Sequence, residues 1–190
     1  MGLRHFVAPS LLITSLVVSV PLKGNAHAPA LPRGAEQATD AAVKAAFLFN
    51  FTKFTDWPAL AQGAPLVACV VGDEGVAAAL VEIVGVHTVA GHRLVLGPSH
   101  DSRTWRACHL LFIAELQMRR SADALAGVTT LPVLTVSDTK GFARSSGIIE
   151  LYANAGQLHF AINVAAAERS GLRLGSQLLS LARIIRQNER

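Results

Sequence analysis

Short apolar runs that alternate with helix-forming stretches are the feature that most constrains this chain. The runs cover residues 66–71, 110–114 and 133–136 and are rich in Val, Leu and Ile. A strand that is apolar on both faces must be covered on both faces, as in a parallel sheet between two layers of helices. Helical stretches follow the first two runs, from about 74 to 84 and from about 118 to 125. The pattern predicts a single α/β domain with a mixed, mostly parallel sheet flanked by helices on both faces.

The second half of the chain adds a hairpin and a terminal helix to this plan. Residues 148–152 and 157–162 flank the sequence Ala-Asn-Ala-Gly, which is typical of a hairpin turn. Helical pieces are expected after the hairpin, at about 164–169 and 176–187. Earlier in the chain, residues 87–96 alternate between apolar and polar positions and are expected to form a partly exposed strand. A C-terminal hairpin and helix therefore complete the predicted domain.

An aromatic-rich helix is predicted at the start of the domain. Thr39 or Asp40 can cap its amino end. Pro58 disfavours helical geometry at Trp57, so the helix should end there. One stripe at helical spacing holds Val43, Phe47, Phe51 and Phe54. A second stripe, with steps of four residues, holds Phe49, Lys53 and Trp57. One stripe can pack on the sheet while the other meets a partner; alternatively, a small domain buries all of these side chains.

Residues 1–28 are typical of a cleavable secretory signal. A cationic start precedes an apolar run over 6–22 and an Ala-x-Ala cleavage site at 26–28. An uncleaved membrane anchor is the alternative, but the run is shorter than the ~20 apolar residues that span a bilayer. Residues 29–38 lack periodicity and are expected to be a flexible lead-in, which leaves 39–190 as the domain. The sequence thus predicts a protein that is exported and free in its compartment.

The charge balance argues against a nucleic-acid partner. The chain has a formal net charge of +4, but the predicted signal holds Arg4 and Lys23, so the mature part is nearly neutral. Basic residues gather near the carboxyl end, at Arg169, Arg173, Arg183, Arg186 and Arg190. They are expected to form the solvated face of the terminal helix, and an acidic partner or an anionic surface is the alternative.

The cysteine count fits an oxidising compartment. Both cysteines, Cys69 and Cys108, lie in the mature part. An even count in an exported protein favours a disulfide between them, and two separate buried thiols are the alternative. Cys69 lies inside an apolar run, where a thiolate is disfavoured, so it is not expected to act as a nucleophile.

No set of residues forms a recognisable catalytic or metal-binding motif. The histidines outside the predicted signal are His87, His92, His100, His109 and His159. No two of them have the one-turn spacing of a zinc protease motif. Ser137 and Lys140 fit a Ser-x-x-Lys pattern, but the serine ends a strand instead of starting a helix. Gly72 and Asp73 follow the first strand, where α/β sheets often bind ligands, yet the phosphate-binding glycine pattern is incomplete, and a turn and helix cap is expected. We therefore expect a binding or regulatory protein that is not an enzyme and needs no metal or cofactor.

Several segments resemble the YfiR family. The most specific is the first helix, 45–58, with the sequence AAFLFNFTKFTDWP. The other similar segments are 70–73, 108–113, 133–138, 160–163 and 178–182. The resemblance implies a periplasmic repressor, dimeric and without catalytic activity, that holds a membrane-bound diguanylate cyclase inactive. It would thereby lower cyclic di-GMP signalling and biofilm formation, and an outer-membrane, peptidoglycan-associated lipoprotein would sequester it.

The chain departs from the family pattern at two places. The family usually has Glu before its Ile-Asn pair, where this chain has Ala161. A second cysteine pair of some members is absent, because Ser145, Ser146 and Tyr152 occupy that region. A partner contact made through a charge at position 161 is therefore not expected.

Two surfaces are candidates for partner binding. The first is the helix stripe of Phe49, Lys53 and Trp57, and the second is the terminal helix with Arg183 and Arg186. The alternative function is a periplasmic small-ligand binding protein without a cyclase partner, which would use the loops after the first and fourth strands. An enzyme of unrecognised type is a further alternative, which a pocket with convergent ionisable groups would support.

Overall fold

The computed structural model describes residues 2, 33–58, 60–85 and 87–186. The predicted signal, apart from residue 2, and residues 29–32 lie outside the described residues. The helices are α1 (Arg33–Lys53), α2 (Glu74–Val84), the 3₁₀ helix η1 (Ser102–Ala107), α3 (Glu115–Ala126), α4 (Phe142–Ser145), α5 (Val164–Arg169) and α6 (Ser176–Leu181). The strands of the main sheet are β2 (Leu66–Val71), β3 (Thr88–Val89), β4 (His92–Leu96), β5 (Leu110–Ile113), β6 (Leu134–Ser137), β7 (Ile149–Asn154), β8 (Gln157–Ile162) and β10 (Arg183–Ile184). A separate antiparallel pair is formed by β1 (Thr55–Asp56) and β9 (Arg173–Leu174).

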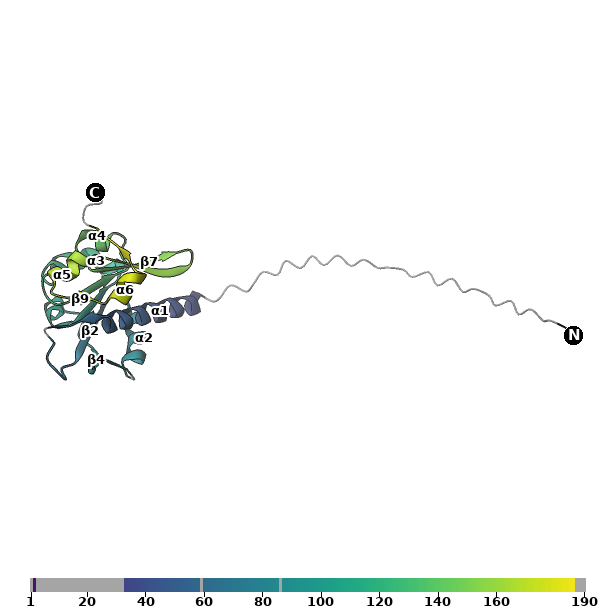
Figure 1. The fold of residues 1–190 in the computed structure, drawn as a ribbon, viewed down its shortest axis with the longest axis horizontal. Coiled ribbons are helices and arrows are strands. Elements are labelled where there is room, and N and C mark those ends of the chain that lie inside the picture. The colour runs from purple at the N-terminus through teal and green to yellow at the C-terminus, as the bar shows by residue number, and fades with distance from the viewer. Residues whose placement is uncertain (1, 3–32, 59, 86, 187–190) are drawn as a thin grey trace. The chain divides into compact units, whose positions relative to one another are not determined.

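The main sheet has eight strands in the order β10-β8-β7-β6-β5-β2-β4-β3. Figure 1 labels three of them, with β2 between β7 and β4. Its pairs are parallel except β7 with β8 and β3 with β4, which are antiparallel. The predicted mixed, mostly parallel sheet is confirmed, and so is the C-terminal hairpin. The hairpin turn is tight because Ala155 and Gly156 both have positive φ, at 49° and 76°.

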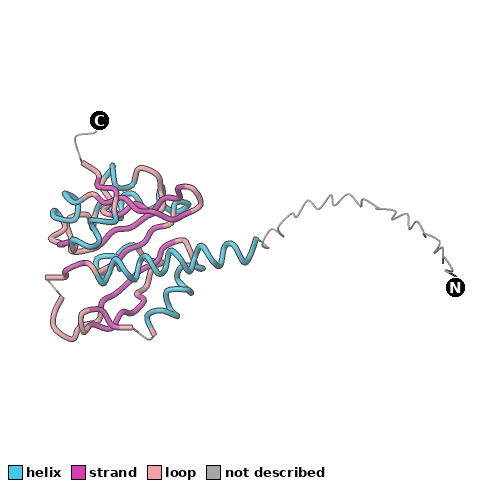
Figure 2. The backbone as a smooth tube through the Cα atoms, turned by 45° about the vertical axis from the view of Figure 1, so that its right-hand side comes forward, coloured by secondary structure: helices cyan, strands magenta, loops and turns pink. Residues whose placement is uncertain are grey.

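Helices cover both faces of this sheet. The hydrophobic core on one face includes residues of α1, α2, α5 and α6, while residues of η1, α3 and α4 pack on the other face. Neighbouring residues of β5 show the division, since Phe112 belongs to the first layer and Ile113 to the second. In Figure 2 the long α1 runs across the strands of the first face. The predicted doubly covered architecture is therefore confirmed.

The order of the strands reverses direction at β2. From β2 the chain crosses through α2 to β4 on one side, whereas β5 pairs with β2 on the other side and is followed outward by β6 and β7. In open α/β sheets such a reversal leaves a crevice at the carboxyl ends of the strands, where ligands commonly bind. The loops after β2 and β5 therefore lie where ligands commonly bind in folds of this kind.

A glycine turn and an aspartate cap connect β2 to α2. Gly72 adopts a φ of 81°, which glycine accommodates without strain. The Oδ1 atom of Asp73 accepts a hydrogen bond from the backbone N–H of Val76 at 2.9 Å. This confirms the turn and cap expected for Gly72 and Asp73.

The first helix begins earlier and ends sooner than predicted. It starts at Arg33, so the prediction of an irregular lead-in over 29–38 is wrong for residues 33–38. This segment contains good helix formers such as Ala, Glu and Gln, and helix propensity does not require the apolar periodicity on which the prediction relied. The helix ends at Lys53, and the strand β1 follows before Pro58. Val43, predicted to lie on the apolar stripe, has 40% of its surface exposed.

Two other elements differ from the sequence prediction. Residues 87–96 form a hairpin of β3 and β4 instead of one strand, because Ala90 and Gly91 take positive φ values and reverse the chain. The predicted terminal helix over 176–187 stops at Leu181 and gives way to β10. The open edge of β8 explains the second difference, since the N–H of Ile185 donates to the carbonyl of Ile162 at 2.7 Å.

Candidate functional site

Part of the second stripe of α1 stays accessible. Phe49 is half-buried, and its ring centroid lies 5.3 Å from that of His87. Lys53 is exposed, with its Nζ 5.7 Å from the ring centroid of Phe49 and 5.9 Å from that of Phe54. The lysine thus lies over two aromatic rings while its ammonium group keeps contact with water. We call Phe49, Lys53 and Phe54 the α1 aromatic surface.

Trp57 lies apart from the helical stripe to which the sequence assigned it. Because α1 ends at Lys53, the spacing of four residues between Lys53 and Trp57 no longer places them on one helix face. The indole Nε1 of Trp57 donates to the carbonyl of Thr52 at 3.2 Å, and its ring meets His109 edge-on at 5.9 Å. Trp57 is half-buried and turns back onto the domain.

The arginines assigned to a terminal helix lie on a strand edge instead. Arg183 belongs to β10, and its guanidinium carbon lies 4.4 Å from the ring centroid of Tyr152. Arg186 is exposed two residues beyond the end of β10. Both arginines are exposed, so the sheet edge at β10 presents positive charge to solvent.

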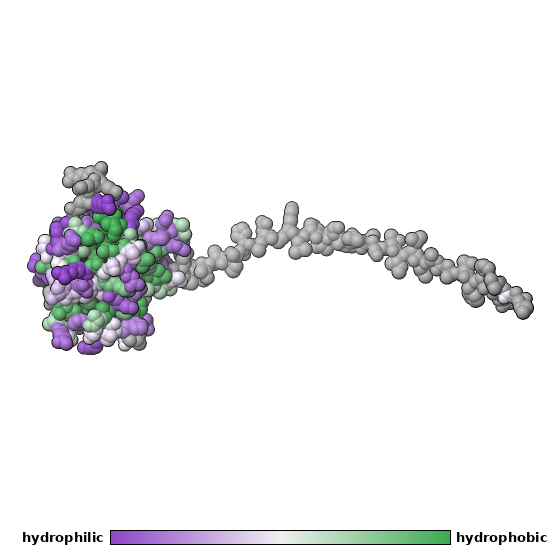
Figure 3. Space-filling model, in the orientation of Figure 1, coloured by the Kyte–Doolittle hydropathy of each residue, from purple (hydrophilic) through white to green (hydrophobic). Residues whose placement is uncertain are grey.

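A small apolar hollow adjoins the α1 aromatic surface through Phe54. It has a volume of about 180 Å³ and lies between α1, β8 and α6. Phe47 and Phe51 line it, with ring centroids 5.8 Å and 5.1 Å from that of Phe160, so these two members of the first stripe pack on the sheet, whereas Val43 is exposed. Leu181 lines the hollow with 72% of its surface exposed. Figure 3 shows one face of the domain, on which apolar areas lie among hydrophilic ones.

An ion-pair network ties three elements together at the carboxyl edge of the sheet. The Nζ of Lys44 lies 3.0 Å from a carboxylate oxygen of Asp40 and 3.0 Å from one of Asp138. The other carboxylate oxygen of Asp138 accepts from the N–H of Glu115, the first residue of α3, at 2.8 Å. Lys44 is mostly buried, and its hydrogen bonds to both aspartates outweigh burial and raise its pKa. This network fixes α1 and α3 relative to the loop after β6.

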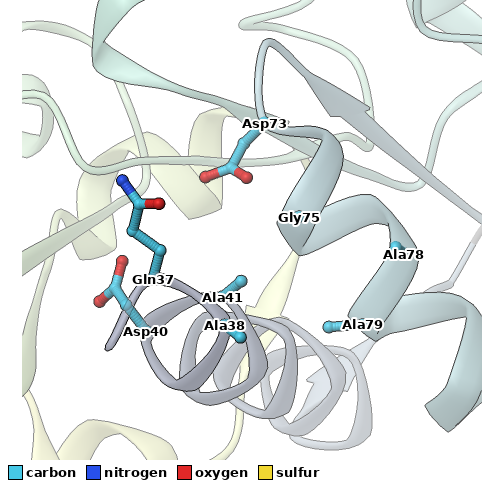
Figure 4. Close-up of a pocket in the computed structure, with 8 residues that line it drawn as sticks. All are labelled: Gln37, Ala38, Asp40, Ala41, Asp73, Gly75, Ala78 and Ala79. Atoms are coloured by element: carbon cyan, nitrogen blue, oxygen red, sulfur yellow. The ribbon is translucent and has the colours of Figure 1, made fainter. Parts of the chain in front are cut away.

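A cleft of about 750 Å³ lies between the amino ends of α1 and α2. Small residues, among them Ala41, Gly75 and Ala78, line it, and the side chains of Gln37 and Asp73 extend toward each other across it (Figure 4). The two carboxylates that reach it, of Asp40 and Asp73, are already engaged, one with Lys44 and the other as the cap of α2. The cleft therefore offers few free polar groups to a ligand.

Two histidines meet at the opposite, amino edge of the sheet. The Nδ1 of His109 accepts a hydrogen bond from the N–H of Val67 at 3.1 Å, so this ring nitrogen is unprotonated. Burial, and to a smaller extent the charge of His92, lowers the pKa of His109. No signal in the sequence indicates the proximity of His92 and His109.

The remaining predicted chemical groups have structural roles. Cys69 and Cys108 form a disulfide, as predicted, with Cα atoms 5.9 Å apart. Ser137 donates from Oγ to the carbonyl of Ile113 at 2.7 Å, which connects β6 to β5. Within the described residues no three His, Cys, Asp or Glu side chains are placed to hold a metal ion. No helix in this part of the chain is long and apolar enough to cross a membrane.

The fold defines the class of the protein as a doubly covered α/β domain, with aromatic, aliphatic and cationic side chains accessible at its surface. The model of a family described as YfiR/HmsC-like matches residues 41–183. The chain belongs to the YfiR/HmsC-like family, and the resemblance noted in the sequence is confirmed. This family is one of periplasmic regulatory proteins, which assigns a regulator role at the level of the family.

A solved structure also resembles the chain. It is a conserved domain protein from Vibrio cholerae O1 biovar El Tor, with 12% sequence identity and a TM-score of 0.47. The match covers 75% of this chain and 60% of the Vibrio protein, so the chain spans less than two thirds of that protein's length. No similar sequence was found among curated proteins.

Proposed function

We propose that the protein is a periplasmic repressor that binds the exported sensor domain of an inner-membrane diguanylate cyclase and lowers cyclic di-GMP signalling. The observation that carries the proposal is the match to the YfiR/HmsC-like family over residues 41–183, nearly the whole described domain. The protein acts by binding alone, without a metal or cofactor. An outer-membrane, peptidoglycan-associated lipoprotein releases the cyclase by sequestering the repressor.

Repression by binding requires unequal affinity for two states of the cyclase. A ligand shifts a conformational equilibrium only by the difference between its affinities for the two states. Reversing a ratio of about 1:99 requires roughly 10⁴-fold tighter binding to the favoured state. The interface must therefore be specific, with buried aromatic or cationic anchors.

The α1 aromatic surface and the arginines at β10 are the parts of the domain that suit such anchors. Lys53 and Arg186 are exposed, and neither makes an ion pair with another described residue. Leu181 on α6 adds exposed apolar area beside the first of these surfaces. We assign the contact with the cyclase to Lys53 and Phe49, with Arg183 and Arg186 as the second contact and Trp57 as a support for the end of α1.

Co-purification tests this assignment. Tagged mature protein is recovered from cells whose membranes are gently solubilised, and the captured cyclase and the cellular cyclic di-GMP are measured. Lys53→Glu and Arg186→Glu should each lower the captured cyclase about tenfold or more, because they reverse the charge of an anchor. The matched controls Lys140→Glu and Arg169→Glu reverse exposed charges elsewhere and should leave capture unchanged.

The outcome also separates the role from the surface. Absence of any cyclase in the wild-type capture, with both proteins present in the cell, would refute the repressor role. If both charge-reversal variants still captured the cyclase, the assigned contact surface would be refuted, while the repressor role would stand. Light scattering of the purified mature protein tests the proposed homodimer, which predicts twice the mass of one chain.

A further inference from the structure

A crevice at the reversal point of the sheet has no role in the proposed function. It has a volume of about 610 Å³ and lies at the carboxyl end of β2. Its walls are the turn at Gly72 and Asp73, the loop before η1, and the first turns of α3. Its size falls in the range of ~300–1,000 Å³ typical of small-molecule sites, and its position is the one at which α/β sheets bind ligands.

A serine hydroxyl that makes no hydrogen bond within the described part of the chain faces this crevice. Ser121 of α3 has only 5% of its surface exposed, and it lines the cavity. Its Oγ makes no hydrogen bond to any described residue, whereas the comparably buried Ser170 donates to the carbonyl of Thr129 at 2.8 Å. Among the described residues no covered side-chain oxygen or nitrogen lacks a partner, so the Ser121 hydroxyl is open to the crevice and is free to hydrogen-bond to a bound molecule.

The ionisable side chains around the crevice differ in sign between its walls. Glu74 and Asp73 belong to the α2 side, and Arg120 belongs to α3 on the other face of the sheet. Glu74 and Arg120 make no ion pair within the described part of the chain, although one cavity holds both. Both side chains are exposed to solvent, and opposite charges on the lining of one cavity match a ligand with charges at both of its ends.

We propose that this crevice binds a small polar zwitterion, a free amino acid or a dipeptide. The carboxylate of the ligand pairs with Arg120, and its ammonium group pairs with Glu74. Ser121 supplies the hydrogen bond that fixes the part of the ligand between these charges, and Gln117 closes the wall beside Gly72. The site does not depend on the proposed cyclase partner, because it is complete within this chain.

Binding is measured on purified mature protein by calorimetry with L-serine, L-glutamine and glycyl-L-serine as probes. The first two probes represent free amino acids, and the third represents dipeptides. Two comparison compounds each lack one of the charged groups. Ethanolamine has no carboxylate, and glycolate has no ammonium group. We expect saturable binding of at least one zwitterion and at least tenfold weaker binding of both comparison compounds.

Two variants test the assigned residues. Arg120→Gln and Glu74→Gln should each weaken binding about tenfold to a hundredfold, because each removes a charge-assisted hydrogen bond. The matched controls are Arg119→Gln on the same helix and Glu82→Gln on α2, which are exposed and do not line the crevice. Melting without ligand verifies that each variant is folded.

Amide chemical shifts locate the bound probe independently of the variants. They should move most at residues 72–74, 99–102 and 117–121. The proposal is overturned if no probe binds at millimolar concentration, if Arg120→Gln binds as well as Arg119→Gln, or if the shifts cluster elsewhere. None of these results affects capture of the cyclase, so the two proposals fail separately.

Discussion

The residue that position 161 can accommodate depends on its neighbour in the adjacent strand. Ala161 of β8 is fully buried and is paired with Glu150 of β7. The Oε2 of Glu150 accepts a hydrogen bond from the N–H of Ala143 at 3.2 Å. The family resemblance implies Glu at the place of Ala161, and side chains of directly paired residues lie only about 5 Å apart. In this chain the neighbouring strand therefore supplies the buried carboxylate.

Placing Glu at position 161 should destabilise the domain. Ala161→Glu puts a second carboxylate opposite Glu150 beneath Ile185, and we expect the free energy of unfolding to fall by about 3 kcal/mol. The double variant Glu150→Ala with Ala161→Glu should regain part of this loss, because it restores a single carboxylate. Urea unfolding measures both, and Ala153→Glu on the same hairpin is the exposed control. If Ala161→Glu and the wild type had the same free energy of unfolding, Glu150 would not restrict the residue at position 161.

His109 should make the stability of the domain depend on pH. Its pKa is lowered in the folded protein, chiefly by burial, so the unfolded chain binds the proton more strongly. The free energy of unfolding should therefore fall as the pH drops below about 6.5 and continue to fall until the folded protein is also protonated. Protonation also abolishes the hydrogen bond that Nδ1 accepts from Val67.

A glutamine at position 109 isolates this contribution. His109→Gln retains an acceptor for the N–H of Val67 and does not bind a proton. Its free energy of unfolding should therefore decline less than that of the wild type between pH 7.5 and pH 5, a range of about 2.5 units that includes the ordinary pKa of histidine. Urea unfolding at a series of pH values gives the slope. His100→Gln, on the exposed loop before η1, should keep the slope of the wild type. An unchanged slope in His109→Gln would contradict the assignment.

At the scale of elements, Lys44 connects α1 to the loop after β6. Lys44→Met removes the partner of Asp138, which is itself largely buried, and should lower the free energy of unfolding by about 2 kcal/mol. The control Lys140→Met replaces an exposed lysine and should change it by less than about 0.5 kcal/mol. Because the pKa of Lys44 is raised, the stabilisation should persist through neutral pH and be lost only as the pH rises above 10.5. Loss of stability at pH 8 would contradict this account.

The strands and most helices could be predicted because their signals are local. The strand over 66–71 is continuous in apolar residues, and Asp73 marks the start of α2. The end of the chain could not be predicted in the same way. Leu178 and Leu181 have helical spacing, but the residues after them pair with the open edge of β8, and no local pattern reveals an open edge.

The candidate surfaces were predictable only in part, for the same reason. Phe49 and Lys53 lie within one helix, so their spacing placed them together. The sequence does not indicate Arg120 and Ser121, because they reach the crevice from a helix far along the chain from Gly72. Sequence reasoning identified the turn after the first strand as a common ligand position, but the opposite wall depends on tertiary structure.

At the scale of the whole molecule, the disulfide closes one half of the sheet. Cys69 lies in β2 and Cys108 just before β5, with a sequence separation of 39. The enclosed segment carries α2, β3, β4 and η1, which form the sheet edge beyond β2 and two walls of the crevice. Both cysteines are buried, in a cluster that includes Trp105. The bond should therefore act as a fixed brace and not as a redox switch.

Removing the brace should loosen this half of the domain first. The double variant Cys69→Ala with Cys108→Ala should lower the free energy of unfolding by about 4 kcal/mol, as expected for a loop of this length. Amide hydrogen exchange should accelerate more in β4 and α2 than in β7 and β8, which lie outside the loop. In the wild type, millimolar dithiothreitol should reduce the bond only as fast as the domain unfolds, because the sulfur atoms are covered. Rapid reduction of the folded protein would instead identify the disulfide as a redox switch.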